Sequence, residues 1–137
     1  MVTILKNSTA LNDLIDCHPN LVIFALDKDY KYITFNSLHS NIMQTIWGKE
    51  IELGVSMLDY INLEEDTEKA KINFDRALSG ETFTLIEEYG KKNLDRHYYK
   101  DTYYPLINSE KEIYGLCVIV EDVTISQTKK EEVAKET

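Results

Sequence analysis

The sequence predicts an α+β domain built on an antiparallel sheet of five strands. Short runs rich in apolar, β-branched and aromatic residues occur as a pair before residue 36 and as a series of three after residue 81, with helical periodicity between them. The turns within the pair and within the series are short. Short turns indicate antiparallel pairing, because parallel strands need a long crossover connection. The length of 137 residues suits one domain with a single core.

Composition and charge limit the classes of partner. With 43% hydrophobic and 28% charged residues, the chain resembles an ordinary globular protein. Its net charge of −9 repels phosphate backbones and anionic lipid surfaces, so we expect neither nucleic acid binding nor membrane insertion. Cys17 and Cys117 are isolated, which indicates neither a disulfide framework nor a metal site and suits the reducing cytoplasm. Cys117 is expected to be a small core residue.

The N-terminal segment predicts a short amphipathic helix over residues 9–18. Leu11, Leu14 and Ile15 fall on one helical face, and Pro19 ends the helix. This apolar stripe either packs on the sheet or meets its copy in a second chain.

A hairpin and a capped helix follow. Residues 21–26 and 30–35 are the predicted strands, joined by a turn at residues 27–29. Asn36 then has the side chain of an N-cap residue for a helix over residues 38–46, because its oxygen can accept from the first unpaired backbone N–H groups.

The middle of the chain contains the clearest helical pattern. After short helical turns within residues 47–62, Asn62 and Glu65 resemble a capping box, and Gly80 marks the end of the helix. The positions that repeat on one face are Leu63, Thr67, Ala70, Phe74, Ala77 and Leu78.

Three strands in series complete the chain, at residues 82–89, 97–107 and 113–122. The last contains the β-branched run Val118–Val120 and only five apolar residues between a glycine and an acid. We expect this strand to be buried on both faces and to lie in the middle of the sheet.

In their order and spacing these elements resemble a PAS domain from about Asp16 to Thr124. The matching pieces are Phe24–Asp27 with Tyr32–Asn36, Glu64–Asp66, Leu78–Glu81, Tyr104–Leu106, Gly115 and Asp122–Thr124. The resemblance implies a sheet with helices on one face, an N-terminal helix at residues 1–19, a PAS domain at 20–124, and the start of a C-terminal signalling helix at 125–137.

The chain departs from the family pattern at two places. Glu110–Glu112 stand in a loop where the family often has glycine, and Tyr98 and Tyr99 stand where it often has tryptophan. Both departures alter the region that faces the expected pocket.

The resemblance implies a sensory or dimerisation module and not an enzyme. Asp122 and Thr124 would tie the last strand to the signalling helix, so that a change in the sheet moves it. We expect a fragment of a longer sensor whose output domain is a histidine kinase or a cyclic-dinucleotide enzyme. A homodimer contact is expected at Leu11, Leu14 and Ile15. The alternative is a free-standing interaction module that binds no ligand.

The resemblance also restricts the cofactors. Family members that form a covalent flavin adduct need a cysteine in the helical region, and residues 38–61 contain none. Haem-binding members carry a histidine on the long helix, and residues 70–77 contain none. His39 is expected to be a surface or cap residue. No cofactor and no metal are therefore expected, although noncovalent flavin or another small ligand stays open.

A ligand pocket is predicted between the sheet and the helices. Strand alternation places Tyr99, Asp101 and Tyr103 on one face of their strand, and the neighbouring strands add further candidates, which are Glu87, Leu116, Val118 and Val120. If that face points inward, Asp101 binds a polar ligand or accepts hydrogen bonds from the tyrosines. Otherwise the tyrosines pack across a half-exposed sheet and Asp101 is solvated. A small acid–base enzyme that uses Asp101 with Tyr99 or Tyr103 is the third possibility.

Overall fold

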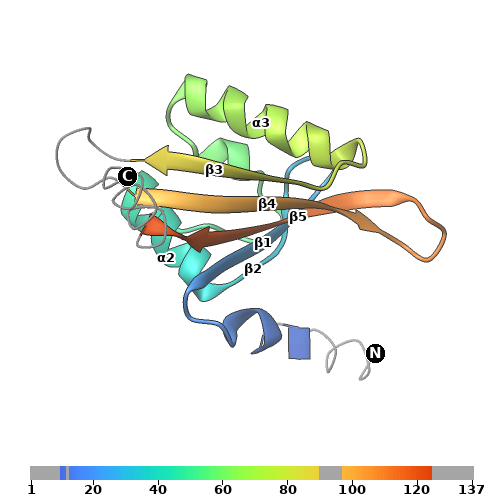
Figure 1. The fold of residues 1–137 in the computed structure, drawn as a ribbon, viewed down its shortest axis with the longest axis horizontal. Helices are drawn as coiled ribbons and strands as arrows, with labels where there is room; N and C mark the ends of the chain where they lie inside the picture. The colour runs from blue at the N-terminus through green and yellow to red at the C-terminus, as the bar shows by residue number, and fades with distance from the viewer. Residues whose placement is uncertain (1–9, 12, 90–96, 125–137) are drawn as a thin grey trace, which may run out of the picture.

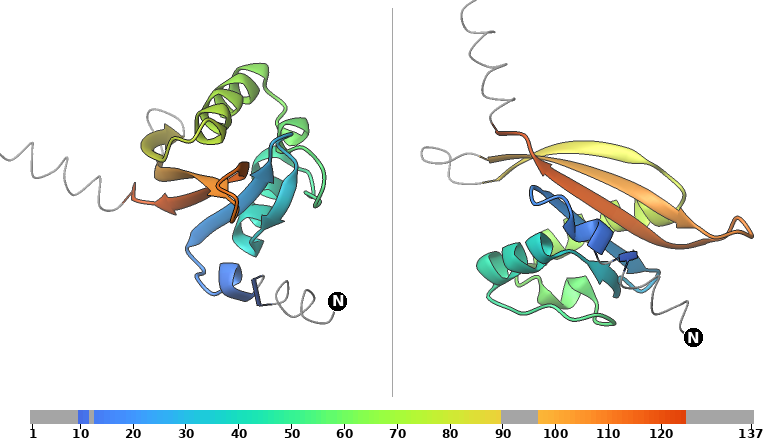
Figure 2. Two further views of the ribbon diagram at one scale, coloured as in Figure 1. Left: turned by 90° about the vertical axis from the view of Figure 1, so that its right-hand side faces the viewer. Right: turned by 90° about the horizontal axis from the view of Figure 1, so that it is seen from below.

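The computed structural model describes residues 10–11, 13–89 and 97–124. It contains a five-stranded antiparallel sheet in the order β2-β1-β5-β4-β3. The strands are β1 (Leu21–Asp27), β2 (Tyr32–Phe35), β3 (Phe83–Tyr89), β4 (His97–Ile107) and β5 (Ile113–Asp122). The helices α2 (Ser37–Trp47), η1 (Met57–Tyr60) and α3 (Glu64–Leu78) cover one face of the sheet (Figures 1 and 2). The predicted α+β class and element order are confirmed.

The last strand, β5, lies in the middle of the sheet, as predicted. It pairs with β1 on one side and with β4 on the other. Only its inward face is deeply buried, however: Leu116 and Val118 are almost inaccessible, whereas Cys117 and Ile119 on the outward face are half-buried. The prediction of burial on both faces, with Cys117 in the core, was wrong because α2 and α3 cover only one side of the sheet.

The core lies between the inward face of the sheet and the two long helices. Phe24 is its centre: its ring packs edge-on against Tyr32 and Phe74, with centroids 6.1 and 6.4 Å apart. Leu26 and Leu116 face each other across β1 and β5 and have no exposed surface. Such a core ties both helices to the central strands.

Asn36 joins three segments of the chain. Its Oδ1 accepts from the backbone N–H groups of His39 (3.1 Å) and Ile23 (3.2 Å). Its Nδ2 donates to the carbonyl oxygens of Ile15 (3.1 Å) and Leu21 (2.6 Å). The predicted N-cap is therefore confirmed, and the same buried side chain also holds the N-terminal segment against β1.

The predicted capping box of α3 was wrong. The N-cap residue is Leu63, which supplies no side-chain hydrogen bond, and Asn62 instead accepts from the ammonium of Lys49 at 2.9 Å. Three acids stand in the first turn, Glu64, Glu65 and Asp66. Their negative charges interact favourably with the positive end of the helix dipole and stabilise the helix start. The predicted N-cap lies one residue before the observed one, and the start of the helix is stabilised by charge and not by a side-chain cap.

The N-terminal apolar stripe is only partly packed. Residues 10, 11 and 13–16 are helical. Ile15 is 8% exposed, whereas Leu11 and Leu14 are 46% and 68% exposed. The predicted signalling helix at residues 125–137 lies outside the described residues.

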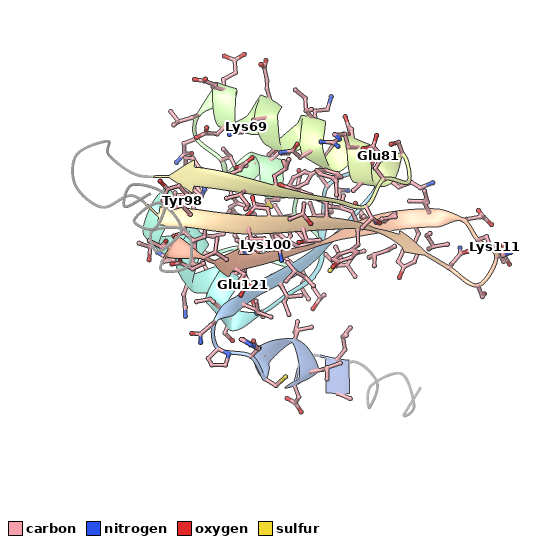
Figure 3. All side chains as sticks on the ribbon, in the orientation of Figure 1. Lys69, Glu81, Tyr98, Lys100, Lys111 and Glu121 are labelled. Atoms are coloured by element: carbon pink, nitrogen blue, oxygen red, sulfur yellow. The ribbon has the colours of Figure 1, made fainter. Side chains whose placement is uncertain are left out.

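The turn between β4 and β5 closes without a glycine. Lys111 adopts a left-handed backbone conformation with φ of 64°, and Figure 3 shows it at the tip of the hairpin. Asn108 Oδ1 accepts from the backbone N–H groups of Glu110 (2.9 Å) and Glu112 (3.0 Å). The asparagine hydrogen bonds hold the turn closed although a lysine takes the position that glycine would favour.

Candidate functional site

A large cavity lies between the inward face of the sheet and the helices, next to the packed core. Its volume is about 1320 Å³, and it is lined by residues of β1, α2, η1, α3, β3, β4 and β5. Pockets for small organic ligands usually measure roughly 300–1,000 Å³, so the space accommodates such a molecule.

β4 presents the predicted residues to this cavity. Asp101 and Tyr103 are each 6% exposed, and with Tyr99 they line the cavity. Lys100, which is labelled in Figure 3, and Tyr104 are exposed on the opposite face. The predicted strand alternation is confirmed, and the alternative with a solvated Asp101 was wrong.

The neighbouring strands supply most of the other predicted residues. Glu87, Val118 and Val120 line the cavity. Leu116 does not: it lies wholly buried in the core, between Leu26 and Pro105 in the sheet. It was a wrong candidate because strand alternation predicts which face a residue is on, but not how far along the strand the cavity extends.

Asp101 is the unusual residue of the site. Its Oδ1 is buried without any hydrogen-bond partner in the part of the chain that the structure describes. Burial, and to a smaller extent the charge of the nearby Glu87, raise the pKa of this carboxyl group to about 7, although Lys69 acts in the opposite direction. Near neutral pH the group is thus divided between its neutral and charged forms.

A salt bridge lies beside Asp101. The ammonium of Lys69 on α3 is 3.7 Å from Glu87 Oε1 on β3. The Lys69 side chain is 59% exposed and that of Glu87 only 12%, so the contact links the rim of the cavity to its wall. Figure 3 shows Lys69 on the part of α3 that lies above the end of β3.

Tyr103 is held by aromatic and polar contacts. Its ring stacks on that of Phe83 with centroids 4.6 Å apart. Burial raises the pKa of its hydroxyl, the charges of Asp101 and Glu87 act in the same direction, and a side-chain hydrogen bond with Asn73 opposes them. The hydroxyl therefore stays protonated and is a fixed polar group inside the cavity.

His39 lies in the core and not at the surface, which corrects the prediction. Its Nε2 is 2.8 Å from the hydroxyl of Tyr32, and its ring stacks on Phe24 with centroids 4.2 Å apart. Burial lowers the pKa of the imidazole to about 3. A sequence signal existed: His39 is in step with Ile42, Met43 and Ile46, the inward face of α2, all of which line the cavity.

Lys69 and Asn73 were also missed. Both line the cavity from α3, and their spacing of four residues places them on one helical face. Asn73 lies one turn and Lys69 two turns before the buried Ala77, and this spacing could have indicated their position.

The exit of β5 forms one end of the cavity wall. Asp122, Val123 and Thr124 belong to its lining. Asp122 Oδ1 accepts from the N–H of Thr124 at 2.9 Å and from its hydroxyl at 2.5 Å. Val123 N–H donates to the carbonyl of Tyr98 at 2.8 Å. The last residues of the sheet are thus tied to the start of β4. Whether Asp122 and Thr124 also tie the sheet to a signalling helix stays a prediction, because residues 125–137 lie outside the described chain.

Neither cysteine lines the cavity: Cys17 is exposed, and Cys117 lies on the outward face of β5. Within residues 10–11, 13–89 and 97–124, no cluster of three or more His, Cys, Asp or Glu is arranged to hold a metal ion. No helix among these residues is long and apolar enough to cross a membrane.

A comparison with protein-family models decides the family. The model described as the PAS fold matches residues 18–128. The chain belongs to the PAS fold family. The PAS match includes every strand of the sheet and both long helices. No curated protein matches the chain.

Solved structures of PAS domains share this architecture. The PAS domain of Bordetella pertussis BvgS has a TM-score of 0.60 at 16% identity, and the match covers 97% of both chains. A sensory box sensor histidine kinase from Vibrio cholerae has a TM-score of 0.53 at 17% identity, covering 89% of this chain and 96% of that one. A Vibrio cholerae VqmA–ligand–DNA complex has a TM-score of 0.60 at 12% identity, covering 88% of this chain and 51% of that one. At these identities the likeness establishes the fold.

Proposed function

We propose that this PAS domain is a sensory module that binds a small molecule in its cavity and transmits the binding through the exit of β5. The observation that carries the proposal is Asp101 Oδ1, a buried oxygen without a hydrogen-bond partner in the described chain, which lines a cavity of about 1320 Å³. A buried polar atom without a partner costs free energy, and a ligand that supplies a donor removes this cost. The proposal gives Asp101 a binding role and no catalytic one.

The route of transmission follows from the shared wall of the cavity. Tyr99 on β4 and Val120 on the adjacent β5 line the cavity. Val120 lies two residues before the exit residue Asp122, and Tyr99 follows Tyr98, whose N–H donates to Thr124. A ligand that displaces Tyr99 therefore acts on the hydrogen bonds that hold Thr124. We propose that this changes the direction in which the chain leaves the sheet.

The setting of the module is part of the same proposal. The receiving partner would be an output domain of a longer chain, a histidine kinase or a cyclic-dinucleotide enzyme, in the cytoplasm. The sensor histidine kinase from Vibrio cholerae supports the first type. The net charge of −9 supports a module that does not itself contact nucleic acid, although the VqmA complex contains DNA. No covalent flavin and no haem are required.

Native mass spectrometry tests the binding function. We expect the protein purified from its natural host to carry a mass that denaturation removes, and an absorption spectrum of the same sample shows whether that mass is a chromophore. Ala70→Phe should reduce the bound fraction, because Ala70 lines the cavity and is half-buried. A protein that carries no additional mass, and whose cavity-lining NMR signals do not respond to a fragment library, would contradict the proposal.

A second function, dimerisation without a ligand, has its own observation. Leu11 and Leu14 are 46% and 68% exposed on the N-terminal helix, next to the packed Ile15. We propose that they contact a second copy of the chain. Analytical ultracentrifugation should then show a dimer that Leu14→Glu dissociates, while Glu68→Gln, at an exposed position of α3, leaves it intact. A wild-type monomer at high concentration would overturn the dimer.

A further inference from the structure

The charge of the cavity lining restricts the ligand. Five acidic residues contribute to the lining, which are Asp66, Glu87, Asp101, Glu121 and Asp122. Lys69 is the one lysine among the described lining residues, which include no arginine, and it is already near Glu87. Buried anions need cationic or multiple N–H partners. This lining therefore disfavours carboxylates and phosphates as ligands and favours cations.

Two of these acids lie close together on one face of the sheet. Glu87 pairs with Tyr99, and Leu85 pairs with Asp101, so that Glu87 and Asp101 are diagonal neighbours across β3 and β4. Asp101 is 6% exposed and its Oδ1 lacks a partner in the described chain. Hydrogen bonds from a positively charged N–H group would satisfy Oδ1 and offset the repulsion between the two carboxylates.

The rest of the lining suits an apolar body. Aromatic rings of Phe24, Trp47, Phe74, Tyr99 and Tyr103 contribute to the cavity from three different directions, the sheet, α2 and α3. Aromatic faces attract cations and pack against flat or aliphatic groups. Tyr99 and Tyr103 flank Asp101 on the same face of β4, so an ammonium group at Oδ1 would have rings on both sides.

We propose that the ligand is a small organic amine, with a protonated N–H group that donates to Asp101 Oδ1 and an apolar or aromatic body that fills the space between the sheet and α2. This inference rests on the proposed function and specifies its ligand. A primary, secondary or amidine-type amine fits, because each offers an N–H group that can donate a hydrogen bond to Oδ1. A quaternary ammonium ion offers the charge without the hydrogen.

Three probes of similar shape test the inference: 2-phenylethylamine, 2-phenylethanol and 3-phenylpropionate. Binding is measured by isothermal titration calorimetry near pH 7.5 and located by NMR shifts of Tyr103 and Asp101. We expect the amine to bind at least about tenfold more tightly than the alcohol, and the carboxylate to bind more weakly still. Asp101→Asn should weaken amine binding at least about tenfold. Asp59→Asn is the matched control, because Asp59 is exposed on η1 and lies outside the cavity.

The outcomes separate the two proposals. If the alcohol or the carboxylate binds in the cavity as tightly as the amine, or if Asp101→Asn leaves amine binding unchanged, the amine inference is overturned while the sensory function stands. If no probe shifts a cavity signal and native mass spectrometry finds no bound mass, both are overturned. Because Asn is nearly the same size as Asp and removes a buried carboxyl group, Asp101→Asn should fold, and its thermal unfolding verifies this.

Discussion

The backbone N–H of Tyr98 donates a hydrogen bond to the side-chain oxygen of Thr124 at 3.0 Å. The hydroxyl group of Thr124 also donates a hydrogen bond to Asp122 Oδ1. One side chain therefore joins the end of β5 to the start of β4. Tyr98 is the chain neighbour of Tyr99, which lines the cavity. The exit of the sheet and the wall of the cavity are therefore separated by one peptide unit.

This relationship predicts the effect of Thr124→Val, which removes the hydroxyl at nearly constant volume. We expect a loss of about 1 kcal/mol in the free energy of unfolding, as is usual for one hydrogen bond. We also expect faster hydrogen exchange at the Tyr98 amide, which loses its acceptor. Thr124→Ser keeps the hydroxyl and should exchange like the wild type. Unchanged protection of Tyr98 in Thr124→Val would show that the hydrogen bond does not hold the exit.

Gly115 lies at a position in the sheet that has no room for a side chain. A Cβ atom added there would lie 2.3 Å from the carbonyl oxygen of Leu26 and 3.3 Å from Ile33 Cδ1. The nearer atom is backbone in the paired strand β1, so it cannot move without breaking the ladder. Gly115→Ala should therefore lower the free energy of unfolding by about 3 kcal/mol or more in urea titrations.

Gly48→Ala is the control for that substitution. Gly48 has φ of 68° and open space around its Cβ position, so alanine there meets backbone strain alone and should cost about 1 kcal/mol. Equal losses for the two variants would contradict the steric explanation.

The sequence was sufficient for the order of elements because local signals agree with the fold. Asn36 has the chemistry of an N-cap, and β4 and β5 were predicted with the bounds that the structure gives them, His97–Ile107 and Ile113–Asp122. The wrong start signal of α3 shows the limit of such local reasoning: Asn62 has a suitable side chain, but Lys49, thirteen residues earlier, binds it.

The site was predictable where it follows strand alternation and not where it depends on tertiary packing. Alternation placed Asp101 and Tyr103 on the same face of β4, because a period of two is a property of the strand itself. That this face points inward depends on the helices that cover it, and the sequence left it open. The burial of His39 depends on Phe24 and Tyr32 from other elements. A hydrophobic pattern read from one sequence counts only apolar residues, so it does not predict that a histidine on an apolar helical face is buried.

His39 predicts a loss of stability in acid. Burial lowers the pKa of the imidazole to about 3 in the folded protein, against 6.5 for the exposed group, so the unfolded state binds the additional proton between these pH values. The free energy of unfolding should fall as the pH decreases through this window, by about 2 kcal/mol between pH 7 and pH 5. His39→Gln, which does not titrate, is expected to lack this component in denaturant titrations at both pH values. A wild type and a variant with the same pH dependence would contradict the burial of a neutral imidazole.

The buried carboxyl group of Asp101 predicts the opposite pH dependence, a loss of stability as the pH rises. Its pKa is about 7 in the folded protein against 3.8 for the exposed group, so the folded state binds more protons between these values. The contribution of this group to stability is therefore fully present below pH 3.8 and is lost as the pH rises through 7. Asp101→Asn removes the ionisable group, and we expect it to unfold at a higher urea concentration than the wild type at pH 8 and at nearly the same concentration at pH 4.

The increase in the free energy of unfolding of Asp101→Asn at pH 8 should exceed roughly 0.5 kcal/mol, the largest change that most surface substitutions cause. Asp59→Asn, at an exposed position, should change stability little at either pH. Addition of an amine that binds Asp101 should reduce the difference between the wild type and Asp101→Asn at pH 8, because the ligand supplies the partner that the ionised carboxylate lacks. If Asp101→Asn is less stable than the wild type at pH 8, then the carboxylate is satisfied within the folded chain, and its role as a ligand-binding group loses its physical basis.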